Sequence, residues 1–208
     1  MSGSQVQFGT LDALRGFAAL GVMIFHESLV GTAIMPGGYL AVDLFFLLSG
    51  FVIAHAYRCR MATGLGPRPF LYRRAIRLWP MLAIGAALGI VLHGGHAGSL
   101  LLLPNFMSPE NLFPANPPLW SLLFEVFAYA AFALGGWRLG PRALALLAGL
   151  SALILAAFTM SSGPLVDFGA HWHTFAAGLA RITFGFSAGM LMWHIWQARK
   201  PARQRTYA

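Results

Sequence analysis

Long apolar runs, separated by short segments rich in glycine, proline and arginine, follow one another along most of this chain. Only 10% of its residues are charged, whereas roughly a quarter are charged in ordinary soluble domains. Because so few charges cannot cover the surface of a soluble globule, that class is excluded. Runs of about 20 apolar residues are long enough to cross a bilayer as helices. The sequence therefore predicts an all-α, polytopic bundle in the membrane.

The apolar runs predict six transmembrane helices within a single membrane domain, residues 1–208. They cover residues 11–30, 38–57, 76–92, 119–136, 143–160 and 175–196. A shorter apolar stretch, residues 100–103, ends at Pro104. It is too short to cross a bilayer, so we expect an interfacial or re-entrant segment there.

The 14 lysine and arginine residues are concentrated on one side of this predicted bundle. Six surround the link between the second and third spans, two follow the fourth span, and four follow the sixth. Because basic loops tend to stay in the cytoplasm, we expect both termini and the basic tail, residues 197–208, to be cytoplasmic. This topology also explains the net charge of +8, so we expect the bilayer and no nucleic acid as a partner.

Four ionisable residues fall at a similar predicted depth in four of the spans. His26 and Asp43 lie near the outer ends of the first two spans, and Glu125 and Arg181 each lie six residues into an inward-running span. A charge at membrane depth is costly unless it is paired or faces a wet cavity. The layer therefore predicts a functional site in the outer half of the membrane. An ion pair between Glu125 and Arg181 that only fastens two spans is the alternative.

Basic side chains form a second predicted level near the inner surface. Arg15 precedes His26 by eleven residues, so the two project from one helix face about 16 Å apart along the axis. Arg74 and Arg77 are three residues apart, which places them on one face of a helix. Arginine binds phosphate well, so these residues predict a site for a phosphorylated cytoplasmic ligand. Topology and attraction to anionic lipid are the alternative explanation.

Five segments in order along the chain carry a resemblance to a known family. They are LDALRGFAALGVMIFH (11–26), GGYLAVDLFFLLSGFVI (37–53), FLYRRAIRLWP (70–80), NPPLWSLLFEVFAY (116–129) and ARITFGFSAGML (180–191). Together they resemble membrane acyltransferase family 3. The resemblance implies a polytopic enzyme of the bacterial cytoplasmic membrane that transfers an acyl group, acetyl in the first instance, from acyl-coenzyme A to a hydroxyl of a sugar, polysaccharide or lipid-linked glycan. Acyl-coenzyme A is then a donor substrate, and no cofactor is permanently bound.

The same resemblance implies catalysis at His26 and donor binding at Arg15, Arg74 and Arg77. We expect neutral His26 to take the proton of the attacking hydroxyl while Asp43 orients its ring; a transient acyl-histidine is the alternative. The candidates for substrate binding are Glu125, Arg181, Trp120 and Ser121. The histidines of the chain form no coherent ligand set, so we expect no metal site.

Two features depart from the usual member of that family. Glu125 is followed by Val126, where many members have a second acidic residue, and the usual member has several further spans after the sixth. A short natural variant, a truncated product and a chain completed by homo-oligomerisation remain open. Besides an acyltransferase, the sequence leaves a transporter of a glycan-type substrate and an inactive relative that acts as a binding partner.

Overall fold

Six α-helices and a few short 3₁₀ turns account for most of the part of the chain that the structure describes. The computed structural model describes residues 9–27, 37–162 and 168–199, with side chains for all of these except residues 9–12, 23, 26, 27 and 162. The helices are α1 (Gly9–Glu27), α2 (Leu40–Ala62), α3 (Pro67–His93), α4 (Leu119–Leu134), α5 (Pro141–Ser162) and α6 (Phe175–Arg199). The 3₁₀ turns are η2 (Ala97–Leu101), η3 (Gly136–Arg138) and η5 (Trp172–Thr174).

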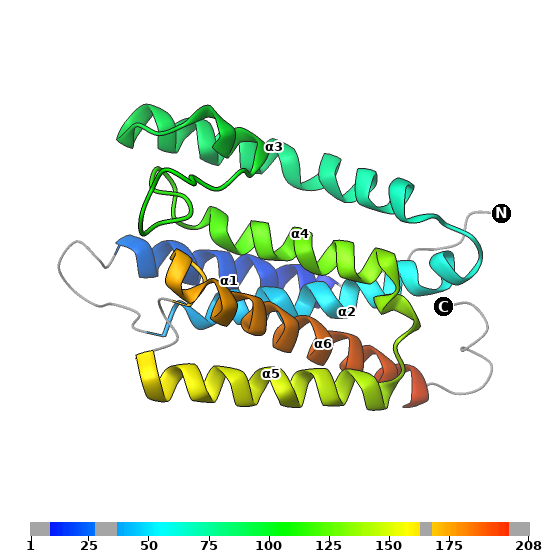
Figure 1. Ribbon diagram of the computed structural model, residues 1–208. Helices are drawn as coiled ribbons and strands as arrows, with labels where there is room; N and C mark the ends of the chain where they lie inside the picture. Colours follow the sequence, from blue (N-terminus) through cyan, green and yellow to red (C-terminus); the bar gives the residue numbers. More distant parts are fainter. Residues whose placement is uncertain (1–8, 28–36, 163–167, 200–208) are drawn as a thin grey trace.

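Successive helices run in opposite directions through the bundle (Figure 1). The start of α1 and the end of α6 lie at the same end, on the right of Figure 1. The end of α2, the start of α3 and the link between α4 and α5 lie there too, and these are the parts that carry Arg58 to Arg77, Arg138 and Arg142. Apart from Arg15 in α1 and Arg181 in α6, the described arginine residues thus gather at one end of the bundle, which we call the basic end.

The prediction of an all-α membrane bundle is confirmed. Within the described residues, α2, α3, α5 and the segment Trp172–Arg199 are long and apolar enough to cross a membrane. The helices α1 and α4 contain shorter apolar segments, Ala13–Val22 and Leu119–Leu134. All six helices overlap the predicted spans, but the number that cross the membrane stays a prediction.

The start of α3 differs most from the prediction. The helix begins at Pro67, nine residues before the predicted span, so it includes the whole arginine-rich segment from Arg68 to Arg77. Proline is favoured at the first helical position because its fixed backbone angle suits the helix and its missing amide hydrogen is not needed there. Pro80 also lies inside the helix, as membrane helices tolerate. This early start carries Arg74 into the bundle.

The short apolar stretch at residues 100–103 overlaps η2, a 3₁₀ helix of five residues. Its length excludes a span of its own, in agreement with the prediction. The helix packs against α3, and the chain then leaves through Leu102 in a left-handed conformation. Whether this segment is interfacial or re-entrant stays a prediction.

Glycines let α2 and α6 approach each other closely. A β carbon added at Gly50 would fall on the backbone carbonyl of Phe186, and one added at Gly189 would fall on that of Leu47. Small residues at such positions are the usual means by which membrane helices come into backbone contact. The resulting packing of α2 on α6 brings the start of α2 beside Arg181.

Candidate functional site

Arg74 lies on the buried face of α3. The buried residues of this helix are Phe70, Arg74, Leu82, Ala86 and Gly89, a spacing of three, four and eight residues that marks one face of an α-helix. Arg74 is 7% exposed. A charged side chain in the middle of an apolar helix face is costly in a membrane unless it has partners, and these come from α2 and α4.

Four side chains from three helices form what we call the polar network: Ser49, Arg74, Glu125 and Tyr129. Ser49 Oγ donates a hydrogen bond to Glu125 Oε1 at 2.7 Å, and the Tyr129 hydroxyl donates to the same oxygen. Ser49 Oγ and the Tyr129 hydroxyl are 3.0 Å apart. Arg74 Nη2 donates to the Tyr129 hydroxyl over a longer distance, 3.4 Å. The network thus links α3 to α4 and α2.

Two polar atoms of the network have no partner among the described residues. Arg74 Nε is buried without a hydrogen bond, and both of the hydrogen bonds that Glu125 accepts there go to Oε1. The guanidinium group of Arg74 lies over the rings of Tyr129 and Tyr57, 4.9 and 5.7 Å from their centroids. Cation–π contacts compensate part of the cost of burying the charge. The unbound Glu125 oxygen and Arg74 Nε leave the network able to bind a polar ligand.

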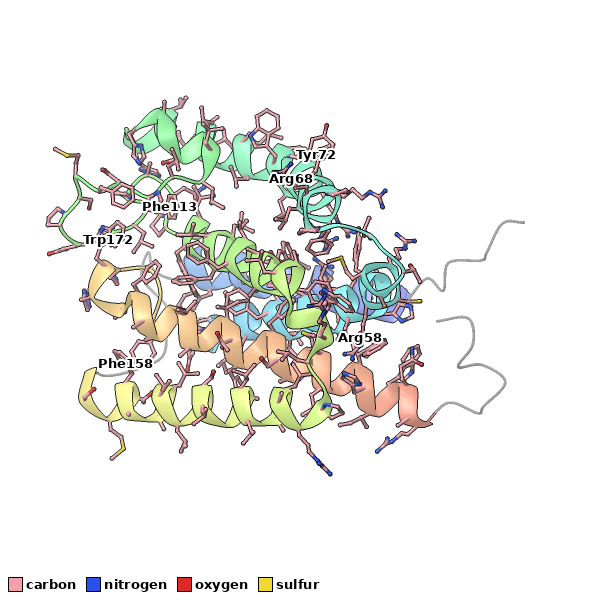
Figure 2. All side chains as sticks on the ribbon, turned by 45° about the vertical axis from the view of Figure 1, so that its right-hand side comes forward. Arg58, Arg68, Tyr72, Phe113, Phe158 and Trp172 are labelled. Atoms are coloured by element: carbon pink, nitrogen blue, oxygen red, sulfur yellow. The ribbon has the colours of Figure 1, made fainter. Side chains whose placement is uncertain are left out.

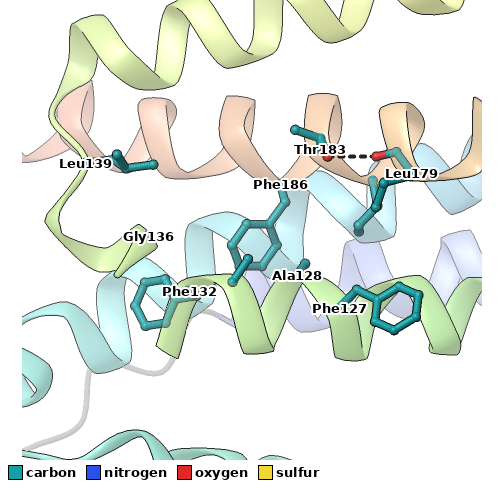
Figure 3. A pocket seen from close by; sticks show the side chains of 10 residues that line it. Phe127, Ala128, Phe132, Gly136, Leu139, Leu179, Thr183 and Phe186 are labelled. Carbon is teal, nitrogen blue, oxygen red and sulfur yellow. Dashed lines mark hydrogen bonds between the residues drawn. The ribbon is translucent and has the colours of Figure 1, made fainter. Parts of the chain in front are cut away.

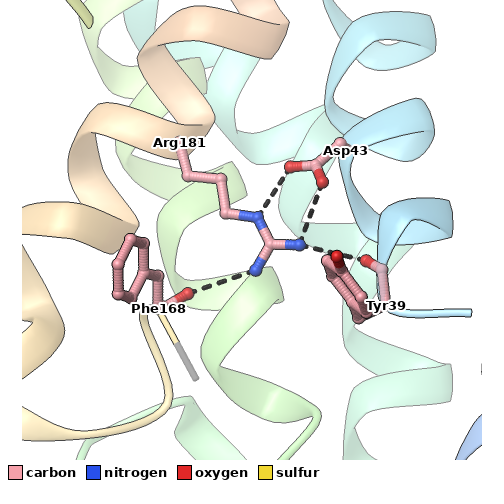
Figure 4. Close-up of polar contacts among 4 residues, drawn as sticks. All are labelled: Tyr39, Asp43, Phe168 and Arg181. Carbon is pink, nitrogen blue, oxygen red and sulfur yellow. Dashed lines mark hydrogen bonds and ion pairs between the residues drawn. The ribbon is translucent and has the colours of Figure 1, made fainter. Parts of the chain in front are cut away.

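Arg181 forms a second polar group, the Arg181 clamp, at the opposite end of the bundle from the basic end. Its Nε and Nη2 donate to the two carboxylate oxygens of Asp43 at 2.7 and 3.0 Å (Figure 4). Nη2 also donates to the backbone carbonyl of Tyr39 at 3.0 Å, and Nη1 to that of Phe168 at 3.3 Å. Arg181 is only 2% exposed. The clamp therefore fastens the start of α2 to α6 and to the segment before η5.

The clamp corrects two predictions about the ionisable layer. Arg181 pairs with Asp43, so the alternative of a Glu125–Arg181 ion pair is wrong. Glu125 is also deeper than predicted, because it meets Ser49, six residues after Asp43 along α2 and so about 9 Å further in. Crossing angles and side-chain lengths move carboxylates away from the depth that counting along each helix assigns to them.

The predicted partnership of His26 and Asp43 falls partly outside the described side chains. His26 lies in the last turn of α1, and its side chain is not described. Asp43 lies in the first turn of α2 and directs both carboxylate oxygens to Arg181. The structure thus gives Asp43 a defined structural partner, while its contact with His26 stays a prediction.

The predicted donor-binding arginines lie in three different environments. Arg15 is half-buried in α1, Arg74 is buried, and Arg77 is exposed. We expected Arg74 and Arg77 to lie together on one face of α3. Arg74 instead belongs to the buried stripe of the helix, and Arg77 lies off this stripe. The structure brings Arg74, and not Arg77, to Glu125.

Trp120 and Ser121 lie at the start of α4 beside the Arg181 clamp. Trp120 is 8% exposed, and the Arg181 guanidinium group lies 5.5 Å from the centroid of its ring. Ser121 Oγ donates to the backbone carbonyl of Pro118 at 2.9 Å, within its own turn. Both contacts stabilise the clamp and the helix start, and their role in substrate binding stays a prediction.

Arg58 links three elements at the basic end. Its Nη1 donates to the carbonyl of Leu139 at 3.0 Å and to His194 Nε2 at 2.6 Å. Because arginine only donates, His194 accepts through Nε2 and carries its hydrogen on Nδ1. The guanidinium group also lies 5.3 Å from the Trp193 ring centroid. Figure 2 shows Arg58 at the end of the bundle away from Phe113 and Trp172.

A small cavity of about 120 Å³ lies between α4 and α6 (Figure 3). Its lining is almost entirely apolar, and the one hydroxyl, that of Thr183, donates to the Leu179 carbonyl at 2.7 Å. The Phe186 ring lines this cavity and also contacts Tyr129 of the polar network, with 6.3 Å between ring centroids. Apart from that hydroxyl, the side chains that line the cavity are apolar.

Ser49 and Tyr129 are the functional candidates that the sequence did not single out. Both are uncharged, so a search for ionisable residues passes over them. Tyr129 follows Glu125 by four residues, which places the two on one helix face, and this spacing was the available signal. Among the described residues, no group of three histidine, cysteine or acidic side chains lies close enough to hold a metal ion.

The family model for an acyltransferase domain, that of acyltransferase family 3, matches residues 8–208. The chain belongs to acyltransferase family 3. The resemblance inferred from the five segments is therefore confirmed, and acyl transfer is the class of reaction of this family.

Three relatives show how far this acyltransferase sequence is shared. "Protein 2 in picA locus" of Rhizobium radiobacter is 35% identical over 178 residues, covering 72% of this chain and 93% of that protein. Acyltransferase MdmB of Streptomyces mycarofaciens is 30% identical over 155 residues, covering 62% of this chain and 39% of that protein. O-acetyltransferase OatA of Staphylococcus aureus is 44% identical over 43 residues, 21% of this chain and 7% of that protein. No solved structure matches the chain significantly.

Proposed function

We propose that this family member transfers an acyl group, most simply acetyl, from acyl-coenzyme A to a hydroxyl of a carbohydrate or lipid-linked glycan. The observation that carries the choice of acceptor is the Glu125 carboxylate, with one oxygen held by Ser49 and Tyr129 and the other unbound among the described residues. A carboxylate oxygen held in this way is suited to accept a hydrogen bond from a substrate hydroxyl. The printed name of OatA, an O-acetyltransferase, supports the same kind of acceptor.

The proposed reaction uses His26 as the proton acceptor. The acceptor hydroxyl loses its proton to neutral His26 while its oxygen attacks the thioester carbonyl, and the coenzyme A thiolate leaves and takes up that proton. We expect His26 near the level of Asp43. Glu125 of α4 contacts Ser49, which lies about 9 Å beyond Asp43 along the axis of α2. A carbohydrate carries several hydroxyls, so one is able to face Glu125 while another reacts at His26. Asp43 keeps Arg181 in place in this scheme.

The proposal also places the donor and acceptor on different sides of the membrane. The phosphates of coenzyme A stay at the basic end, in the cytoplasm, because they cannot cross lipid at low cost. Arg15 and Arg77 would bind them there. The uncharged pantetheine arm then carries the thioester between the helices toward His26.

The direct test measures acyl transfer by the full chain in lipid nanodiscs. With acetyl-coenzyme A and a mixture of carbohydrate acceptors, we expect release of free coenzyme A thiol and an acetylated product. His26→Ala is expected to abolish release, while His93→Ala, a change at an exposed histidine at the end of α3, retains it. Turnover near the parent level in His26→Ala would show that His26 is not the base.

Two other outcomes would replace the proposal. Movement of a glycan into sealed vesicles without covalent change would make the chain a transporter. Binding of a partner protein, with neither acyl transfer nor transport, would make it an inactive relative.

The proposed orientation in the bacterial cytoplasmic membrane has its own test. Cys59 is the chain's single cysteine and is exposed near the end of α2. We expect a membrane-impermeant maleimide to label Cys59 only in inside-out vesicles, and to label Gly37→Cys in a Cys59→Ser background only in right-side-out vesicles. Labelling of both positions from one side would refute the transmembrane route.

A further inference from the structure

Arg74 and Arg77 are three residues apart on α3, but their side chains lie in different environments. Arg74 is 7% exposed and lies between the rings of Tyr57 and Tyr129. Arg77 is exposed and lies off the buried stripe of the helix. Such different environments argue against one phosphate that binds both arginines, because that phosphate would have to be buried and solvated at once.

The hydrogen bonds around Tyr129 have a fixed direction. The Tyr129 hydroxyl has one hydrogen, which it donates to Glu125. Toward Arg74 Nη2, 3.4 Å away, that oxygen can therefore only accept. The guanidinium group of Arg74, the phenol of Tyr129 and the carboxylate of Glu125 thus form a connected row from α3 to α4.

We infer that Arg74 is a positioning residue, which acts through Tyr129 to hold Glu125 and does not bind a donor phosphate. Its charge stabilises the phenol in the orientation in which the hydroxyl donates to Glu125 Oε1. With Ser49 as the second donor, the carboxylate keeps one orientation and presents Oε2 to a ligand. The effects that the inference predicts on turnover rest on the proposed function, whereas the effects that it predicts on coenzyme A binding do not.

The location of Arg74 also disfavours phosphate. A phosphate bound to Arg74 would lie one tyrosine away from the Glu125 carboxylate, and like charges at that separation repel strongly where water is excluded. It would also have to displace the two aromatic rings that flank the guanidinium group. An exposed arginine at the basic end meets neither obstacle.

The first experiment measures binding of coenzyme A, without turnover, to the full chain in nanodiscs. Arg77→Gln is expected to weaken binding about tenfold or more, the cost of one charge-assisted hydrogen bond. Arg74→Gln is expected to change the Kd no more than the matched control Arg73→Gln, which alters an exposed arginine of the same helix. Equal weakening by Arg74→Gln and Arg77→Gln would overturn the inference.

The second experiment is a double-mutant cycle on turnover. Arg74→Gln and Tyr129→Phe are each expected to lower kcat with little change in the donor KM. If Arg74 acts through Tyr129, the double variant is no slower than the slower single variant, because contacting residues are coupled. Independent effects that multiply, or a raised donor KM in Arg74→Gln, would refute the positioning role.

Two milder variants replace Arg74→Gln if that variant does not insert into the membrane. Arg74→Lys keeps the positive charge on the buried stripe of α3, and Tyr129→Phe removes only a hydroxyl. A parent chain that binds coenzyme A but transfers no acyl group would contradict the proposed function and leave the binding comparison valid.

Discussion

Asp43→Ala tests whether the Arg181 clamp is a structural ion pair. The substitution removes two of the four hydrogen bonds that join Arg181 to other described residues, and it takes the Asp43 carboxylate away from a guanidinium group that is 2% exposed. Removing one partner of a buried ion pair costs roughly 3–5 kcal/mol, mainly because the remaining charge stays buried.

The cost here is expected at the lower end of that range. Two carbonyl oxygens, those of Tyr39 and Phe168, still accept hydrogen bonds from Arg181 at 3.0 and 3.3 Å. Asp43 itself is 29% exposed, so water can replace part of what is lost. We therefore expect Asp43→Ala to lower the free energy of unfolding by about 3 kcal/mol. Removing both charges, in Asp43→Ala with Arg181→Met, is expected to cost less than Asp43→Ala alone, since the buried guanidinium charge is removed together with the carboxylate.

Unfolding in mixed micelles of increasing SDS fraction, followed by tryptophan fluorescence, measures these differences. Glu110→Ala, which changes an exposed carboxylate outside the helices, is the matched control. A cost for Asp43→Ala within about 0.5 kcal/mol of that control would refute the structural role. A double variant whose cost equals the sum of the single costs would show that the two charges are not coupled.

Two further substitutions test the packing of the bundle. Gly189→Leu is expected to prevent the close approach of α2 and α6, because its β carbon would fall on the Leu47 carbonyl. The yield of folded protein and the midpoint of SDS unfolding measure this effect. The control Gly149→Leu is expected to be tolerated, because a β carbon there meets nothing within 4 Å. Arg58→Gln is expected to destabilise the basic end by about 1–3 kcal/mol, read as faster amide exchange around η3. Exchange no faster than in Arg60→Gln, an exposed neighbour on α2, would contradict that role for Arg58.

The helices were predictable because membrane helices are long apolar runs, and the runs in this sequence are separated by clear breaks. The start of α3 was predicted too late, because the arginines from Arg68 to Arg77 interrupt the apolar run from which the span was counted. A stripe at intervals of four residues was nevertheless present in the sequence: buried Phe70, Arg74, Leu82 and Ala86, with half-buried Leu78 among them. Placing Arg74 on that stripe predicts its burial.

The partners of the ionisable residues were only partly predictable. Counting residues from each helix end placed Asp43 and Arg181 at one level, and they do form an ion pair. The same count put Glu125 at that level, although it contacts Ser49 deeper in α2. Depth along a helix axis does not tell which helix faces meet. The network around Glu125 therefore could not be predicted without knowing how α2, α3 and α4 pack together.

The two polar groups of the bundle differ in how completely their polar atoms are paired among the described residues. The Arg181 clamp directs all three guanidinium nitrogens to oxygen atoms, so each of these buried donors has a partner. The polar network leaves Arg74 Nε and Glu125 Oε2 without partners among the described residues. Of these two atoms, Arg74 Nε is the buried one, and a buried polar atom without a partner lowers stability. A substrate hydroxyl would supply a partner for Glu125 Oε2, which is why the proposed function places the acceptor beside Glu125.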